Sequence, residues 1–292
     1  MINTTEILKK YNFPIRKQYG QNFLTDINVL EGIVNAAGIT KDDIVIEIGP
    51  GLGALTGLLC EAAKAVVAVE IDKMLIPILN ETMAEYKNFV LINEDILKVD
   101  IDRLIDTVIE ISDGECDKKS ENSVRVKVVA NLPYYITTPI IMQLLEKQEA
   151  LDSITVMIQK EVAERMKEGP GSKAYGALSL AVQFYSRPQI AMIVSKNCFI
   201  PKPDVDSAVI TLDIYKPEER PVQAKDSKLM FDIIRAAFNQ RRKTLVNALA
   251  NAQNLNLSKA QITAALEKIG KPETVRGEAL TLEEFAKLSD VI

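Results

Sequence analysis

The chain has 292 residues, of which 47% are hydrophobic and 26% are charged, and its formal net charge is −5. This length and composition are typical of a globular protein with one large domain and one small one, and no apolar run approaches the length of a bilayer span. Because the sequence contains no histidine, a Ser-His-Asp hydrolase, an H-E-x-x-H metalloprotease and a His-ligated zinc deaminase are all excluded.

Along the chain, apolar runs alternate with amphipathic segments from residue 44 onward. Buried strands are expected at 44–48, 65–70, 89–93, 125–130 and 154–159. Helices are expected at 54–63, 73–86 and 137–147. Strands that alternate with helices predict parallel pairing, and therefore a doubly wound, Rossmann-like α/β domain. The polar stretch 112–123 has no periodicity and is expected to be a surface loop.

The last part of the chain is predicted to form a separate helical domain. Two late strands are expected at 188–194 and 207–214, which would complete a mostly parallel, seven-stranded sheet. The segment 216–225 carries two prolines and many charges and is typical of a linker, and helical spacing of apolar residues follows it. We therefore expect an N-terminal arm plus Rossmann-like domain over 1–215 and a small all-α domain over 226–292.

The three cysteines are widely spaced and form no C-x-x-C pair, so the sequence gives no sign of a disulfide framework or a zinc site. The first ten residues mix polar and charged side chains and lack the apolar stretch of a secretory signal. We therefore expect a cytoplasmic protein with no metal and no membrane partner, and we expect it to be a monomer.

A glycine-rich turn follows the first predicted strand. Gly49, Gly51 and Gly53 lie between this strand and a predicted helix. Glycines at such a place let the backbone turn tightly and approach a ligand, which makes Gly49 and Gly51 candidate cofactor-binding residues. The turn alone is compatible with NAD, with FAD, with S-adenosylmethionine or with packing only.

Acidic residues at the ends of three strands favour S-adenosylmethionine. Glu47 directly precedes the glycines, and a carboxylate there suits a cofactor with a sulfonium and an ammonium better than one with a pyrophosphate. Glu70 ends the next strand, where an acid accepts hydrogen bonds from ribose hydroxyls, although it could also be a strand-end cap. Asp95 follows the third strand and is placed to accept from an adenine amine.

The run Asn131, Leu132, Pro133 and Tyr134 follows the fourth strand and predicts chemistry on an adenine amine. This amine is a poor nucleophile because its lone pair is delocalised into the ring. Asn131 and a nearby main-chain carbonyl would accept its two hydrogens and aim the nitrogen at a methyl donor. Pro133 fixes φ and removes a donor, and Tyr134 offers a face for stacking on an extruded base. An ordinary strand-to-helix turn is the alternative interpretation.

Positive charge is clustered although the chain is acidic overall, and an RNA-binding protein is often basic. One cluster contains Lys9, Lys10, Arg16 and Lys17, and the other contains Arg235, Arg241, Arg242 and Lys243. Either cluster could be a solvated helix face. The candidate RNA-binding residues are Arg16, Lys17, Lys202, Arg241, Arg242 and Lys243.

Several motifs together resemble the KsgA/RsmA family of small-subunit ribosomal RNA adenine dimethyltransferases. They are QNFL, EIGPGLGALT, VEID, NEDIL, NLPYYITTPI, QKEVAERM, YGALSL and FIPKPDVDSAVI, with a weaker match at FNQRRKTL. The resemblance implies an S-adenosylmethionine-dependent enzyme that dimethylates two adjacent adenines in the 3′-terminal hairpin loop of 16S rRNA. The implied partner is the 30S subunit or its precursor during ribosome biogenesis.

The resemblance also implies roles for individual residues. Asn22 and Leu24 would touch the cofactor from the N-terminal arm, and Phe199 would be a second stacking partner for the base. Without the resemblance, Phe199 is equally compatible with a core aromatic before a proline turn. The cofactor site would be completed by Gly49, Glu70, Asp95 and Asn131, and the target amine would be held by Asn131, Leu132 and Tyr134.

Other functions remain open at this point. One is an Erm-type 23S rRNA adenine dimethyltransferase, and the long helical tail together with FNQRRKTL argues against it. Another is a largely non-catalytic ribosome-assembly checkpoint factor, against which the presence of Glu70, Asp95 and Asn131 argues. A NAD-dependent oxidoreductase is a distant alternative because the NLPY run has no role in hydride transfer.

Overall fold

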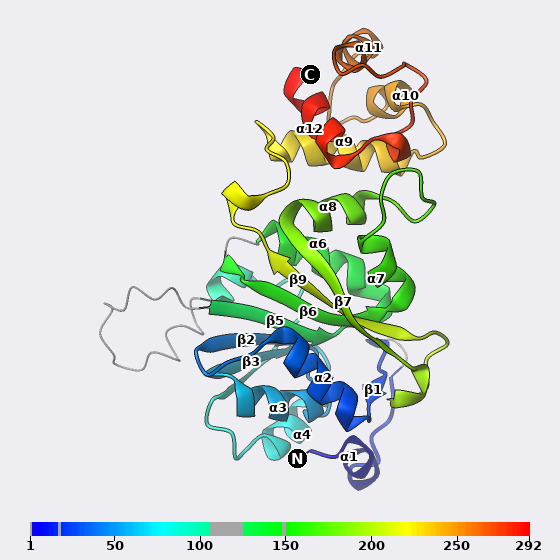
Figure 1. The fold of residues 1–292 in the computed structure, drawn as a ribbon. Coiled ribbons are helices and arrows are strands. Elements are labelled where there is room, and N and C mark those ends of the chain that lie inside the picture. Colours follow the sequence, from blue (N-terminus) through cyan, green and yellow to red (C-terminus); the bar gives the residue numbers. More distant parts are fainter. Residues whose placement is uncertain (1, 17–18, 106–124, 148–149) are drawn as a thin grey trace, which may run out of the picture. The chain divides into compact units, whose positions relative to one another are not determined.

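The computed structural model describes residues 2–16, 19–105, 125–147 and 150–292 (Figure 1). The chain forms two compact units, the first from residues 1–163 and 187–214 and the second from residues 164–186 and 215–292. The boundaries expected from the sequence, 1–215 and 226–292, differ from these units mainly because the segment 164–186 groups with the C-terminal helices. The loop expected at 112–123 lies outside the described residues.

A seven-stranded sheet in the order β4-β3-β2-β5-β6-β9-β7 forms the centre of the first unit. The strands β4, β3, β2, β5 and β6 are parallel to one another, and β9 is antiparallel to β6. The Rossmann-like fold with a mostly parallel sheet is thus confirmed. The bounds are β2 Asp43–Ile48, β3 Ala65–Glu70, β4 Phe89–Asn93, β5 Arg125–Asn131, β6 Ser153–Gln159, β7 Ser186–Val194 and β9 Ser207–Ile214.

Helices cover both faces of this sheet, which explains why its central strands are continuous apolar runs. Every residue of β2 and β3 is buried. Figure 1 shows α2 and α3 on one side of the sheet and α6 on the other. The helices of this unit are α1 Thr4–Lys10, α2 Ile27–Ala37, α3 Ala54–Ala62, α4 Ile76–Thr82 and α6 Thr137–Glu146.

One predicted helix begins later than expected. The sequence predicted a helix over 73–86, but α4 begins at Ile76. The Asp72 side chain accepts a hydrogen bond from the Met74 main chain and so forms a turn there. Pro77 then lies within the first helical turn, the only part of a helix that tolerates proline well. The prediction was therefore wrong at its start, because turn chemistry overrode the apolar pattern, and it was wrong at its end as well, since α4 ends at Thr82.

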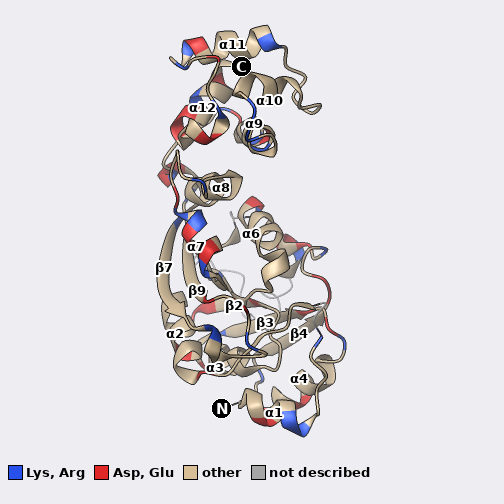
Figure 2. Ribbon diagram, turned by 90° about the vertical axis from the view of Figure 1, so that its right-hand side faces the viewer, with Lys and Arg blue, Asp and Glu red and all other residues tan. Residues whose placement is uncertain are grey.

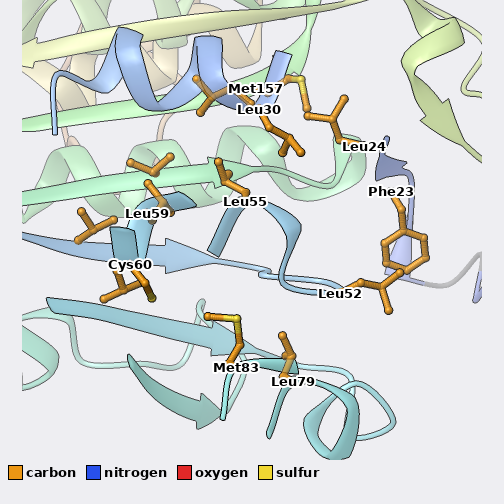
Figure 3. Packing of buried hydrophobic residues seen from close by; sticks show 14 of the residues in the cluster. Phe23, Leu24, Leu30, Leu52, Leu55, Leu59, Cys60, Leu79, Met83 and Met157 are labelled. Atoms are coloured by element: carbon orange, nitrogen blue, oxygen red, sulfur yellow. The ribbon is translucent and has the colours of Figure 1, made fainter. Parts of the chain in front are cut away.

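The N-terminal arm, described for residues 2–16 and 19–24, packs against the carboxyl ends of the parallel strands. Its short strand β1 Phe23–Leu24 pairs in antiparallel fashion with β8 Phe199–Ile200. The Thr4 hydroxyl donates to the Leu24 carbonyl at 2.9 Å, which ties α1 to this strand. Figure 3 shows Phe23 beside Leu52 in the buried apolar cluster that joins the arm to the glycine-rich turn.

The second unit is helical. It contains α8 Ala177–Tyr185, α9 Ser227–Asn239, α10 Leu245–Ala250, α11 Lys259–Lys268 and α12 Leu282–Val291, while α7 Lys160–Met166 begins in the first unit and ends in this one. The Tyr185 ring stacks on Phe231 with centroids 5.3 Å apart, and the Tyr175 hydroxyl donates to the Leu280 carbonyl at 2.9 Å. These contacts explain why α8 groups with the C-terminal helices.

The expected linker 216–225 includes a short 3₁₀ turn, Pro217–Glu219. Arg220 places its guanidinium over the rings of Phe184 and Tyr185, at 5.1 and 5.4 Å from their centroids. This part of the linker is thus packed on α8. Among the described residues, no helix combines the length and the apolar character needed to cross a bilayer.

Candidate functional site

A deep cavity lies where the parallel strands of the first unit end. It contains about 1110 Å³ of space between protein atoms, including the part open to solvent. Ligands of doubly wound folds bind outside the carboxyl ends of the strands, because the loops that follow the strands converge there. The loops after β2, β3, β4 and β5 all line this cavity, and the arm residues 19–24 line it as well.

The glycine-rich turn after β2 needs glycine at three positions. Gly49, Gly51 and Gly53 have φ values of 68°, 61° and 88°, a region that residues with a Cβ rarely adopt. The Gly49 N–H donates to the Val69 carbonyl at 2.9 Å, which fixes the turn to the end of β3. A Cβ on Gly51 would lie 3.3 Å from the Phe23 ring. The turn therefore brings main chain, not side chains, to the cavity.

Two buried carboxyl groups face this cavity. Glu47 is 1% exposed, and its Oε2 has no hydrogen-bond partner. Burial raises the pKa of Glu47 to about 8 and that of Glu70 to about 7. Glu70 accepts from the Asp72 N–H at 2.8 Å and from the Gly51 N–H at 3.3 Å.

An unpartnered buried acid is costly unless a ligand completes its bonding. These two carboxyl groups therefore fit a ligand that brings positive charge and hydroxyl groups. Asp95 lines the same cavity, and its Oδ1 accepts from the Leu97 N–H at 3.1 Å. Glu47, Glu70 and Asp95 are thus three acids that line one cavity.

Asn131 ends β5, and its amide has a defined orientation. The Asn131 Nδ2 lies 3.1 Å from the Asn22 carbonyl oxygen, so the NH₂ end must face the arm. A carbonyl only accepts hydrogen bonds, and the Oδ1 of Asn131 is thus directed elsewhere as an acceptor. The Asn22 side chain in turn donates to the Gly20 carbonyl at 3.2 Å.

The rest of the NLPY run is fixed by its neighbours. The Pro133 carbonyl accepts from the Thr137 hydroxyl at 3.0 Å and from the Ile136 N–H at 3.3 Å, which links this run to the start of α6. Leu132 is buried, and its N–H donates to the Met157 carbonyl at 3.1 Å. The Tyr134 hydroxyl and the buried Ser207 hydroxyl lie 2.8 Å apart. Both ends of the tyrosine are therefore held before any substrate enters.

The cavity brings together most of the residues singled out from the sequence but not Phe199. Asn22, Leu24, Gly49, Gly51, Glu70, Asp95 and the run 131–134 all line it. Phe199 is 3% exposed, packs in the apolar cluster and pairs with Leu24 across the short β1–β8 ladder. In this structure its ring is part of the core, and it is not among the residues that line the cavity.

The candidate RNA-binding residues differ in their surroundings. The Arg16 guanidinium lies 3.5 Å from the Asp72 carboxylate. Lys17 lies outside the described residues. Lys202, Arg242 and Lys243 are exposed. Arg241 is less free, because it donates to the Lys173 carbonyl at 3.0 Å and pairs with Glu278 at 3.3 Å. Figure 2 shows both signs of charge along α9, α11 and α12, so the basic residues there form no uniform positive face.

Sequence reasoning missed the polar residues that support this site. Gln21, Asp72 and Ser207 lie within the motifs QNFL, VEID and FIPKPDVDSAVI, but none of the three was assigned a role. Their partners are far away in sequence, as in the contact between Gln21 and Asp72. The sequence contains one signal for Asp72. Glu70 and Asp72 are two acids in a run of three residues, and only one of them is needed to bind a ribose.

Comparison with known proteins gives a consistent result. The family model described as "Ribosomal RNA adenine dimethylase" matches residues 12–291. The chain is 55% identical to "Ribosomal RNA small subunit methyltransferase A" of Lachnoclostridium phytofermentans, with 99% of this chain and 95% of the relative covered. It is 51% identical to the protein of the same name from Clostridium acetobutylicum, with 99% and 98% covered.

Solved structures show the same fold. A dimethyladenosine transferase from Plasmodium falciparum matches with a TM-score of 0.67 and 25% identity, over 91% of this chain and 95% of that one. The 23S rRNA methyltransferase ErmE matches with a TM-score of 0.63 and 22% identity, over 92% and 99%, and this likeness concerns the fold alone. From the family model and the relatives together, this chain belongs to the ribosomal RNA adenine dimethylase family.

Proposed function

We propose that this protein transfers methyl groups from S-adenosylmethionine to the exocyclic amines of two adjacent adenines in the 3′-terminal hairpin loop of 16S rRNA. It acts on small-subunit particles during ribosome biogenesis. The proposal is supported by relatives about half identical over the full chain and named small-subunit methyltransferases. The observation that carries it is the orientation of Asn131, whose NH₂ group is bound by the Asn22 carbonyl.

The acids of the cavity hold the cofactor, which when bound supplies an electrophilic methyl group on a positively charged sulfur. Glu47 offers its unpartnered carboxylate oxygen to the cationic part of the ligand. Glu70 is held by the Asp72 and Gly51 N–H groups at the end of β3, where it accepts from ribose hydroxyls. Asn22, Leu24, Gly49 and Gly51 form the cavity wall around these acids.

The NLPY run holds the target amine. Asn131 accepts one amine hydrogen through Oδ1, because its Nδ2 donates to the arm. The Leu132 carbonyl is the second acceptor, since the Pro133 oxygen already accepts from Thr137 and Ile136. The amine becomes strongly acidic as the new bond forms and releases its proton to solvent. The site therefore needs no histidine as a base. Its rate enhancement comes from the orientation of the target amine relative to the methyl donor.

Tyr134 receives the base. Its hydroxyl is bonded to Ser207, which fixes the plane of the ring at the end of the cavity. An adenine extruded from an RNA loop would stack on this face, and stacking on an aromatic side chain stabilises an unstacked base by roughly 1–3 kcal/mol.

A methyl-transfer assay tests the proposal directly. Undermethylated 30S and 50S subunits are each incubated with the protein and a labelled methyl donor, and the RNA is digested to nucleosides. We expect label in dimethyladenosine from 30S subunits only. Label from 50S subunits would instead support an Erm-type activity, and the absence of label from both would support a non-catalytic assembly factor.

A further inference from the structure

We propose that Asp72 is a positioning residue that holds the N-terminal arm over the cavity by accepting a hydrogen bond from Gln21. The proposal rests on the proposed function only for the identity of the ligand in the cavity. Neither residue was assigned a role from the motifs, and neither has to touch the reacting atoms for the proposal to hold.

The Asp72 carboxylate is deeply buried and fully engaged. It is 1% exposed, and its Oδ2 accepts from the Gln21 Nε2 at 2.9 Å. Its Oδ1 accepts from the Met74 N–H at 3.0 Å and lies 3.5 Å from the Arg16 guanidinium. A buried carboxylate is tolerated only when such partners replace its water, so the arm supplies part of the bonding that the Asp72 carboxylate needs.

Gln21 uses both ends of its amide. While Nε2 donates to Asp72, Oε1 accepts from the Arg16 N–H at 2.8 Å. The amide orientation is therefore fixed by a donor on one side and an acceptor on the other. The Gln21 side chain thus links the main chain of Arg16 to Asp72.

The contact between Gln21 and Asp72 connects the side of the site with the cofactor acids to the side that holds the target amine. The Asp72 N–H donates to the Glu70 Oε1 at 2.8 Å, on the side of the cofactor acids. Asn22, next to Gln21, accepts from the Asn131 Nδ2 at 3.1 Å, on the side of the target amine. Release of Gln21 from Asp72 would therefore loosen residues 19–22 at the cavity wall and weaken the hold of Asn22 on the amide of Asn131.

Exchange of the two side-chain types provides the sharpest test. In Asp72→Asn, the new NH₂ group must face either Gln21 Nε2 or the Met74 N–H, and two donors meet. In Gln21→Glu, two carboxylates meet. In the double variant Gln21→Glu/Asp72→Asn, the new carboxylate at position 21 accepts from Arg16 and from the new amide, whose oxygen still serves Met74. The double variant keeps the net charge of the wild type.

Two readouts are measured: hydrogen exchange of residues 19–24 in the ligand-free protein, and the Kd for S-adenosylmethionine by calorimetry. Each single variant is expected to speed this exchange and to raise Kd about tenfold, the loss typical of one hydrogen bond to a charged group. The double variant is expected to return to within about threefold of the wild type. Asp102→Asn, which removes only a surface pair with Lys147, is the control and should leave both readouts unchanged.

Two results would overturn the proposal. One is wild-type exchange of residues 19–24 in both single variants. The other is a double variant that is no better than either single variant, which would make the contact incidental to the fold. If the wild-type protein itself bound no S-adenosylmethionine, the proposed function would fail, whereas exchange in the ligand-free protein would still decide the role of Asp72.

Discussion

Asn131 uses the two ends of one amide for two purposes, and this division leads to a specific expectation. Asn131→Ala removes an acceptor for the target amine together with the bond to the Asn22 carbonyl. We expect kcat for methyl transfer to fall roughly 100-fold, the scale on which loss of one oriented polar group slows a reaction. The Kd for the cofactor should change much less, because the acids that hold it remain. Wild-type turnover would show that the amine is held by other groups.

Glu47 and Glu70 lead us to expect that cofactor binding strengthens as pH rises. Burial raises the pKa of Glu47 to about 8 and that of Glu70 to about 7. In the free protein these groups therefore gain protons as pH falls through this range. A cationic ligand favours their ionised forms, so binding must release those protons. Below pH 8, each unit by which the pH is lowered should raise Kd by up to about tenfold for every proton that binding releases.

Calorimetry from pH 6 to pH 9, in two buffers of different ionisation enthalpy, measures both the affinity and the protons released. In Glu47→Gln the upper part of this pH dependence should disappear, because the amide does not titrate. A variant whose profile matches that of the wild type would exclude Glu47 as a linked group.

At this scale the sequence identifies residues better than it places them. Glu47, Glu70 and Asn131 could be found because each ends a strand, and parallel strands bring their carboxyl ends together. Phe199 lies in the core because β8 pairs with β1 across about 175 residues of chain, and no local pattern reveals that pairing. The same holds for Gln21 and Asp72, which are 51 residues apart.

Among the elements, the glycine-rich turn makes a comparison of two glycines informative. Gly51 and Gly38 both have positive φ, but a Cβ would meet the Phe23 ring at Gly51 and nothing within 4 Å at Gly38. Gly51→Ala and Gly38→Ala should each lower the free energy of unfolding by about 1–2 kcal/mol, through backbone strain. Only Gly51→Ala should also weaken cofactor binding. Equal Kd values for the two variants would separate the turn from the cofactor site.

The elements that the sequence predicts best are the strands of the large sheet, which were all predicted to within two residues. Uninterrupted apolar runs mark the central strands. The helices α1, α2, α7 and α8 were not predicted. The helices α1 and α2 are capped by the side chains of Asn3 and Asp26, which accept hydrogen bonds from main-chain N–H groups of the first turn, and such residues are equally common in loops.

For the whole molecule, the exposed basic residues of the second unit should bind the ribosomal particle. Arg242 and Lys243 are exposed, whereas Arg241 bonds to Lys173 and Glu278 within the unit. The double variant Arg242→Glu/Lys243→Glu should weaken binding to 30S subunits. The slope of its salt dependence should fall by about one unit for each phosphate that these side chains no longer neutralise. Its thermal stability should stay that of the wild type.

Arg241→Glu is the matched comparison, because it should lower thermal stability as well as affinity. Filter binding at several salt concentrations, with melting curves alongside, measures both quantities. If the double variant bound 30S subunits as the wild type does at every salt concentration, these two side chains would be solvated and no more.

The chain passes between the two units three times, at 163/164, 186/187 and 214/215. A single cut near residue 225 would thus leave α8 attached to the sheet, and the rings of Phe184 and Tyr185 would lose their contacts with the Phe231 ring. Grafting the helical part of one family member onto the sheet of another would require two segments to be exchanged together. Because the backbone passes back and forth between the two units, neither unit can be exchanged as one continuous segment.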